Sequence, residues 1–361
     1  MIKFKHLLFS ITIASLSIVC AQAQETVRMN AIKANDYGVV YSLPKTSLVL
    51  TFKIKKTTYQ RGDFYQYAQR YLGVQSPFTE DKTVYELEDV RVANKGIPDK
   101  SNSFMVEFRS NTLEPYVYLT KDGLICSVNA APELEPAVAV ETEKTAEPSV
   151  NPRRFFSEET LMAGSSAKQA ELVSRQILDL RRSRNDILTG EAENMPPDGE
   201  AYKVVMNSIN EQEKALTEMF SGNSTTETFT TVLTVIPDEN NIERKVIVRF
   251  SEKLGLVDAD DLAGAPVYLS LTNKTPKPEL QLSEKDLQRL EGKLREGLVY
   301  NIPGKANLKI EYNNQLISNV ETDVVQYGSQ DVLTKKMFDN LKQPIKVIFY
   351  PELGAIKQII Q

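Results

Sequence analysis

The chemistry that this sequence offers depends mainly on carboxylates, because histidine is almost absent. The 361-residue chain has 48 aspartates and glutamates but one histidine, His6, which lies in a leader-like N-terminus. A mature chain without histidine cannot build Ser-His-Asp or Cys-His nucleophile systems. Two carboxyl groups at the right separation are enough for a glycosidase. Among so many acidic residues, however, the sequence does not single out a pair.

A Ser-x-x-Lys spacing occurs twice and therefore has little weight as a catalytic signal. Ser165 and Lys168 fit the spacing of penicillin-recognising enzymes, and Ser42 and Lys45 fit it equally well. Those enzymes also need Ser-Asp-Asn and Lys-Thr-Gly elements, which the chain lacks. We expect Ser165 or its neighbour Ser166 to cap a helix, with Lys168 facing water.

An acidic loop near residue 260 matches a calcium-binding loop only in part. Asp258, Asp260 and Asp261 lie close to Gly264, but Leu262 occupies the position of a third ligand. No glutamate follows at the distance that such a loop requires. We expect these acids to be solvated turn residues, and we predict no metal and no cofactor.

Charged and aromatic side chains form a candidate interaction surface. A predicted helix before residue 190 carries several arginines, which either form solvated surface ion pairs or bind an anion or a partner. Tyrosines earlier in the chain either pack in a core or stack against sugars. The candidate surface comprises Arg175, Arg181, Arg182, Arg184, Tyr59 and Tyr65.

Two helices joined by a turn are predicted within residues 157–222. Apolar residues recur at helical spacing in both, so each helix has one apolar stripe that must be buried. The stripes comprise Ala170, Val173, Ile177, Leu180 and Ile187, and then Tyr202, Val205, Ile209, Leu216 and Met219. Gly190 and Gly222 are predicted to end the two helices. We expect the stripes to pack against each other as an antiparallel helical hairpin.

Strands and turns are predicted on both sides of the helical pair. Before it, Asp63 and Gly73 are expected to bound a short helix, and Lys121-Asp122-Gly123 to form a hairpin turn. After it, Asn313-Asn314 is a predicted tight turn between strands, and Ser283 is expected to start a helix.

The predicted fold class is α+β, with two β-rich, sandwich-like modules separated by the helical hairpin. Residues 129–152 are rich in proline and glutamate and have few large apolar groups, which is typical of an extended linker. The predicted parts are a signal peptide (1–24), an N-terminal β-rich module with one small helix (25–128), the linker (129–152), the helical hairpin (153–222) and a C-terminal β-rich module with one helix (223–361).

The first 24 residues have the pattern of a secretory signal peptide. A positively charged start precedes an apolar run over residues 7–19, and Ala21-Gln22-Ala23 is a small-x-small cleavage site. No other stretch approaches the roughly 20 apolar residues of a spanning helix, so we expect no transmembrane span after cleavage. A lipid anchor at Cys20 is a rival prediction, although Val19 is not the small residue that usually precedes a lipidated cysteine.

Charge and cysteine content argue against nucleic-acid binding and against an internal disulfide. Of the 43 basic residues, Lys3 and Lys5 leave with the leader, so 41 remain against 48 acidic ones. No Lys/Arg run is long enough to follow a phosphate backbone, and nucleic acid is therefore not an expected partner. Cys126 is the only cysteine after cleavage, so no internal disulfide forms, and we expect this thiol to be buried.

Short sequence blocks recur in the two β-rich stretches. Residues 38–44 (GVVYSLP) return as residues 297–303 (GLVYNIP), each time before a predicted strand. Residues 118–125 resemble residues 349–356, and both resemble residues 250–257. Each of these three blocks predicts two strands around a turn whose glycine takes positive φ. The two stretches either arose by duplication or are hairpins that use the same residue types.

Four blocks also carry a family resemblance. They are residues 38–46, residues 62–73, residues 176–190 with Pro197-Asp198-Gly199, and residues 250–261. The chain resembles, in these blocks, a family of exported proteins of unknown function from Gram-negative anaerobes of the gut and mouth. The resemblance implies an envelope location and supplies no catalytic residues.

The missing catalytic groups and the modular organisation predict a non-enzymatic cell-envelope protein, periplasmic or associated with the outer membrane. It would bind another envelope protein or a surface glycan, or support an envelope assembly. The alternative is a carbohydrate-binding protein, or one that acts on glycans through carboxylates and tyrosines. A third hypothesis is a transpeptidase-like enzyme that uses Ser165.

Overall fold

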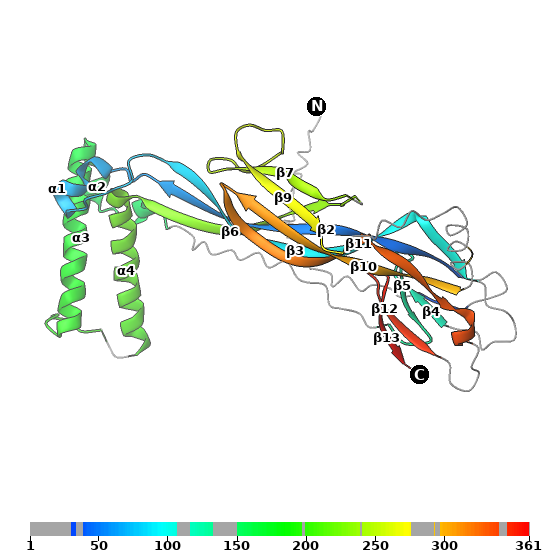
Figure 1. Cartoon of the computed structure of the whole chain (residues 1–361). Helices are drawn as coiled ribbons and strands as arrows, with labels where there is room; N and C mark the ends of the chain where they lie inside the picture. Colours follow the sequence, from blue (N-terminus) through cyan, green and yellow to red (C-terminus); the bar gives the residue numbers. More distant parts are fainter. Residues whose placement is uncertain are drawn as a thin grey trace, which may run out of the picture.

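One long strand, β2 (Val39–Gln60), runs along the sheets of the molecule and ends near the helices (Figure 1). The computed structural model describes residues 30–33, 39–106, 116–132, 150–196, 199–238, 240–275, 292, 297–338 and 345–360. The 22 residues of β2 extend over about 70 Å at the usual rise of a strand. Its start lies in one apolar core, its middle lies in a second, and its end leads to a helical third.

The helical end is built from α3 (Ser166–Thr189) and α4 (Glu200–Ser221). Shorter helices cover the ends of this pair that face the strands, as Figure 1 shows. They are η1 (Tyr65–Tyr67), α1 (Ala68–Leu72), η2 (Pro152–Phe155) and α2 (Glu158–Leu161). Ser165 caps α3 by accepting a hydrogen bond from the backbone N–H of Lys168 at 3.2 Å.

The glycines end the helices as predicted, whereas the predicted cap at Asp63 is wrong. Gly73 and Gly190 follow α1 and α3 with φ of 69° and 78°. Asp63, by contrast, caps no helix, because Phe64 precedes η1 and no side chain caps it. The loop is positioned instead by the backbone N–H of Phe64, which donates to the carbonyl of Met219 at 2.7 Å.

The two helices lie side by side (Figure 1). Their buried apolar residues lie in the halves near α1. Ala170, Val173 and Ile177 pack with residues of α4 and α1, as the apolar spacing of α3 predicts. Val205, on the predicted stripe of α4, is 36% exposed. In the described chain, no third helix or strand packs against this far part of the pair. Its apolar residues therefore remain partly exposed to water.

Two antiparallel sheets share the middle core. One has the order β3-β2-β6, with β3 (Lys82–Val106) and β6 (Asn223–Val235) on either side of β2. The other has the order β11-β10-β9-β7-β8. Its strands are β7 (Ile242–Ser251), β8 (Gly255–Val257), β9 (Ala265–Asn273), β10 (Gly297–Tyr312) and β11 (Gln315–Thr334), which leads into η3 (Lys335–Phe338). Alternate residues of β2, from Leu48 to Ile54, pack against Leu269 and Leu308 of the second sheet.

A third antiparallel sheet closes the end opposite the helices, in the order β1-β4-β5-β12-β13. Its strands are β1 (Asn30–Lys33), β4 (Tyr116–Leu119), β5 (Ile125–Val128), β12 (Lys346–Tyr350) and β13 (Ala355–Ile360). Val117, Ile125 and Val347 pack there against the first residues of β2 and β10.

The two β-rich stretches do not form two separate modules. Strand β2, before the helical pair, is hydrogen-bonded to β6, after it, from Leu48 opposite Val235 to Gln60 opposite Asn223. Strand β5 likewise pairs with β12, where Val128 lies opposite Val347. Each stretch has one apolar face that the other covers, so the strands of both share sheets and cores. The helical pair extends from one end of this common body and does not divide it.

Several predicted features lie outside the described residues. They are the signal peptide with Cys20, residues 133–149 of the linker, Pro197 and Asp198 of the inter-helix turn, and residues 283–291 of the predicted third helix. Within the part of the chain that is described, no helix is both long and apolar enough to cross a membrane.

The recurring blocks occupy matching places in two long hairpins. In β2–β3 the register jumps beside Pro44, and residues 99–102 of β3 are left without partners in β2. In β10–β11 it jumps between Ile302 and Gly304, and residues 325–328 of β11 are left without partners in β10. The same irregularity at the same block supports the duplication.

Candidate ligand-binding pocket

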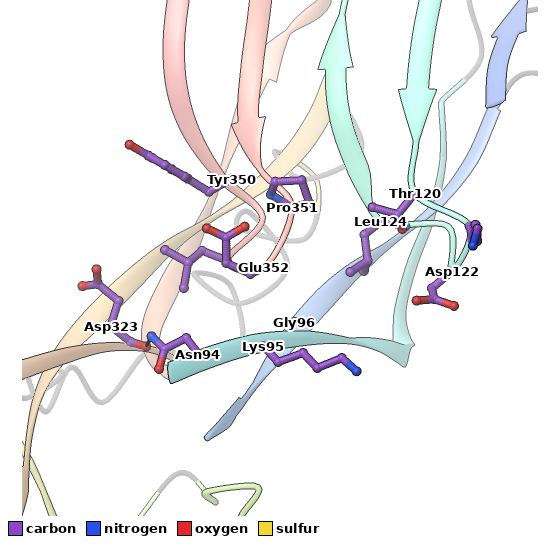
Figure 2. Close-up of a pocket in the computed structure, with 12 residues that line it drawn as sticks. Asn94, Lys95, Gly96, Thr120, Asp122, Leu124, Asp323, Tyr350, Pro351 and Glu352 are labelled. Carbon is purple, nitrogen blue, oxygen red and sulfur yellow. Dashed lines mark hydrogen bonds between the residues drawn. The ribbon is translucent and has the colours of Figure 1, made fainter. Parts of the chain in front are cut away.

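A pocket of about 840 Å³ lies between two hairpin turns and the edge strand β3 (Figure 2). One turn is residues 120–124, between β4 and β5, and the other is residues 350–353, between β12 and β13. Residues 94–96 of β3 and Asp323 of β11 complete the lining. We call this the hairpin-turn pocket. Its volume falls within the range of small-molecule and cofactor sites, roughly 300–1,000 Å³.

Each turn is closed by its own backbone around a glycine with positive φ. Gly123 has a φ of 80°, and its N–H donates to the carbonyl of Thr120 at 3.0 Å. Gly354 has a φ of 64°, and its N–H donates to the carbonyl of Tyr350 at 2.7 Å. Glycine adopts this conformation at little steric cost, so both turns hold their shape independently of the side chains at their tips.

The two turns are attached to the body by matching hydrogen bonds from the recurring blocks. The backbone N–H of Ser42 donates to the carbonyl of Gly123 at 3.0 Å, and that of Asn301 donates to the carbonyl of Gly354 at 2.9 Å. Asn301 also uses its side-chain amide, which donates to the carbonyls of Leu353 at 3.0 Å and Pro44 at 3.4 Å. Asn301 is 2% exposed, so its side-chain amide is removed from water and depends on these two carbonyls for its hydrogen bonds.

A buried tyrosine joins the two blocks to each other. The hydroxyl of Tyr41 donates to the carbonyl of Val299 at 2.9 Å and accepts from the N–H of Val299 at 2.8 Å. Burial raises the pKa of Tyr41 well above its usual value, although the bond to the Val299 backbone opposes this shift. The phenol therefore stays neutral and keeps both bonds.

The second turn sits directly on β3 at Gly96. A Cβ atom added to Gly96 would lie 2.6 Å from the Cα of Glu352. Real Cβ atoms do not approach so closely, so only glycine allows this contact. Gly96 therefore sets the distance between β3 and the turn that carries Glu352.

The charged residues of the pocket are divided between its two ends (Figure 2). Lys95 extends toward the turn that carries Lys121 and Asp122, whereas Glu352 and Asp323 lie at the other end. Asp323 is already paired with Lys305 at 2.8 Å. Within the described ranges, neither Lys95 nor Lys121 forms an ion pair. In the part of the chain that the structure describes, two lysines thus line the pocket without an ion-pair partner.

The buried cysteine lies close to this site but is chemically quiet. Cys126 is 2% exposed, and its thiol lies 3.8 Å from the carbonyl of Leu124. Burial, and after it the charge of Glu352, raises the pKa of Cys126 to about 12. Since the thiolate is the nucleophile, the thiol is unreactive at neutral pH. The prediction that Cys126 is buried is confirmed.

Comparison with known proteins identifies a family. A family model described as "Domain of unknown function (DUF4831)" matches residues 37–357, which is most of the chain. The chain belongs to the DUF4831 family. Neither a curated protein nor a solved structure matches it. The matched range of this DUF4831 chain contains both turns of the pocket, β3 and the anchoring residues Ser42 and Asn301.

The arginines proposed from sequence lie on α3 of the DUF4831 chain, away from the pocket, and each contacts a carboxylate. Arg181 pairs with Glu213 at 2.7 Å, and Arg184 pairs with the other oxygen of the same carboxylate. The remaining pairs are Arg175 with Glu171 at 2.5 Å and Arg182 with Asp179 at 3.6 Å.

The two proposed tyrosines lie where β2 meets the helical end. Tyr59 contacts the ring of Phe78 edge-on, and the ammonium of Lys82 lies 5.3 Å from its ring centre. The guanidinium of Arg61 lies 5.0 Å from the ring centre of Tyr65. The structure therefore brings the proposed residues to the helical half of the DUF4831 chain and none of them to the hairpin-turn pocket.

Sequence reasoning missed the pocket because its walls come from distant segments. The recurring turn blocks were the available signal, since residues 118–125 and 349–356 contain both turns. Nothing in the spacing shows that the two turns face each other across β3.

The weaker motifs have local structural roles in the DUF4831 chain. The hydroxyl of Ser165 accepts the capping bond described above, and the ammonium of Lys168 pairs with Glu171 at 3.3 Å. Asp261 accepts a hydrogen bond from the N–H of Ala263 at 2.9 Å, within its own turn. In the described parts of the chain, no three His, Cys, Asp or Glu side chains are grouped so that they could hold a metal ion.

Proposed function

We propose that the chain is a non-enzymatic cell-envelope protein that binds a macromolecular partner through the hairpin-turn pocket. The observation that carries this proposal is the pair of lysines, Lys95 and Lys121, which line a cavity of about 840 Å³ without ion-pair partners in the described chain. The export signal expected in residues 1–24 and the family resemblance support the envelope location.

The construction of the pocket suits recognition. Binding residues are disproportionately found on loops that a rigid scaffold positions. Here the turns are fixed by backbone bonds from Ser42 and Asn301, while the side chains at their tips are exposed to solvent or line the pocket. We regard the two packed sheets as a sandwich-like body, and α3 with α4 as a helical hairpin that extends from it. The pocket and the helices would then lie at opposite ends, which would let one chain connect two neighbours.

Co-purification from envelope fractions in mild detergent tests the proposal. The bait is the full chain, and the test variant carries Lys95→Glu with Lys121→Glu. Lys253→Glu is the matched control, because Lys253 holds the corresponding position in the third recurring turn, between β7 and β8, away from the pocket. We expect a partner that wild type and the control retain and the test variant loses. A set of co-purifying proteins that is identical for all three chains would refute the proposal.

A second candidate function, glycan binding or carboxylate-based glycan cleavage, is favoured by one observation. Tyr350, Asp323 and Glu352 line the same pocket, and an aromatic ring beside two carboxyl groups is the equipment of a glycosidase. A glycan array and a hydrolysis assay, with wild type and Glu352→Gln, test this alternative. Array binding alone indicates a lectin-like protein, and turnover that Glu352→Gln abolishes indicates an enzyme.

A further inference from the structure

The hairpin-turn pocket opens onto the backbone of an edge strand. Three consecutive residues of β3, Asn94, Lys95 and Gly96, line it. Successive side chains of a strand point to opposite faces, so a cavity that touches three in a row also touches the strand's edge. Strand β3 is the outer strand of its sheet, and no other described strand pairs with its outer side.

A contact further along β3 shows which of its backbone groups point outward. The N–H of Tyr85 donates to the carbonyl of Glu252, in the β7–β8 turn, at 2.8 Å. The side chain of Tyr85 packs toward the middle core, on the inner face of the sheet. In a strand of L-residues, chain direction and side-chain direction together fix the direction of the N–H. Residues of β3 with inner-facing side chains therefore direct their N–H and C=O groups to the outer edge.

Asn94 and Gly96 belong to this inner-facing set. The side-chain amide of Asn94 donates to the carbonyl of Asp323 at 2.8 Å, across the core-facing side. The Cβ position of Gly96 faces the backbone of Glu352. The backbone groups of Asn94 and Gly96 therefore point to the outer edge of β3, beside the pocket that these residues line. Tyr85, at the other end of β3, already has a turn as its partner.

We propose that the pocket binds an extended peptide segment that adds as a strand to the outer edge of β3 at residues 94–96. Strand addition uses main-chain hydrogen bonds for affinity and side-chain pockets for specificity. The unpaired Lys95 and Lys121 favour a carboxylate on the peptide near the β4–β5 turn, and Glu352 at the other end favours a lysine or arginine. This inference rests on the proposed function and specifies the partner as a protein.

Selection from random heptapeptides displayed on phage, with the full chain as target, supplies the probe. The enriched peptide is synthesised, and its affinity is measured by fluorescence anisotropy. We expect affinity to fall about tenfold or more with Lys95→Glu and Lys121→Glu together, and to be unchanged with Lys253→Glu. Thermal unfolding of the three chains verifies that all are folded. Selected peptides that bind the double variant as tightly as wild type would overturn the proposal.

N-methylation of the peptide separates strand addition from side-chain binding. In an added strand, only every second residue directs its backbone N–H toward β3. Methylating that set of alternate amides therefore removes the hydrogen bonds between peptide and β3, whereas methylating the other set leaves them intact. We expect a loss of about tenfold or more in one register only. Equal affinities for both methylated peptides would overturn the strand-addition proposal.

The same materials distinguish failure of this inference from failure of the proposed function. If no peptide is enriched, but a glycan binds wild type and Lys253→Glu and not the double variant, the pocket is the binding site and its ligand is not a peptide. If neither a peptide nor a glycan distinguishes the double variant from wild type, both the inference and the proposed function are wrong.

Discussion

The two long hairpins, β2–β3 and β10–β11, have the same backbone arrangement but differ in the side-chain hydrogen bonds of their anchoring residues. Both break register beside a recurring block and leave four residues of the second strand without partners in the first, 99–102 and 325–328. Both donate a backbone bond to the turn of a short hairpin, from Ser42 in one and from Asn301 in the other. The Ser42 hydroxyl lies 2.8 Å from the exposed Ser103 hydroxyl, whereas the Asn301 side chain is buried and bonds two carbonyls.

This difference shows which features the fold needs and which are available for binding. Backbone bonds and glycines set the shape of both turns, so the tip residues are free to differ. One tip carries Lys121 and Asp122, and the other carries Glu352 and Leu353. Two equivalent pieces of backbone thus present different charges to a common pocket.

The largest expected effect comes from the turn glycines. Gly354→Ala places a Cβ 2.7 Å from Pro44 and 3.0 Å from the Asn301 amide, in addition to the strain of positive φ. We expect it to lower the free energy of unfolding by about 3 kcal/mol. Gly123→Ala has the same strain but open space around its Cβ, and should cost about 1–2 kcal/mol. Urea unfolding measures both, and equal losses would show that the two turns are packed alike.

The next effect separates the two anchoring residues. Asn301→Ala removes a buried side-chain amide that donates to the carbonyls of Leu353 and Pro44, which should cost about 2–3 kcal/mol. Ser42→Ala keeps the backbone bond to Gly123 and loses only an exposed hydroxyl contact, so its cost should be below about 0.5 kcal/mol. Unfolding in urea is again the measurement. A Ser42 variant as unstable as the Asn301 variant would show that both turns depend on the side chains of their anchoring residues.

A smaller effect concerns the two four-residue segments without partners, which we call excursions: residues 99–102 of β3 and 325–328 of β11. The first is held by a carboxylate and the second by an amide. Burial alone would raise the pKa of Asp99, but hydrogen bonds from Ser101, Asn102 and Lys45 outweigh it and hold the pKa at about 2. A lowered carboxyl pKa stabilises the fold above the unfolded value of about 3.9. That stabilisation is lost as the pH falls from about 4 through 2.

The matching excursion supplies the control. Gln326 exchanges two hydrogen bonds with the backbone of Thr46, at 3.0 and 2.9 Å, and carries no charge. Amide exchange should therefore become faster at residues 99–102 between pH 4 and 2, while residues 325–328 stay protected. Asp99→Asn should remove most of this pH dependence. If both segments open at the same pH, the Asp99 carboxylate does not hold its excursion.

Local features of this chain could be predicted from the sequence where a single residue determines the geometry. Gly73 and Gly190 end helices, and Ser165 begins one, because capping involves neighbours only. The Asn313-Asn314 turn is also as predicted, with both residues at positive φ. The cap at Asp63 failed because a distant carbonyl, that of Met219, positions the loop.

The arrangement of the sheets and the pocket could not be predicted in this way. Alternation in β2 shows that Leu48 and Phe52 face a core, but it does not show that residues after the helical pair provide the other side. The pocket likewise requires residues 94–96 to meet two turns from other parts of the chain. Charge spacing identified the arginines of α3, but it could not identify partners on another helix, such as Glu213 of α4.

The smallest expected effect tests whether the side chains at the turn tips contribute to the stability of the fold. Exchanging the charges, with Lys121→Glu and Glu352→Lys together, leaves both glycines and both backbone anchors unchanged. The free energy of unfolding should therefore change by less than about 0.5 kcal/mol. Removing the negative charge of Glu352 should also lower the pKa of Cys126, because that charge is the second cause that raises it. Urea unfolding and a thiol titration above pH 9 measure the two effects, and a large loss of stability would mean that the tips support the fold and are not free to vary with the ligand.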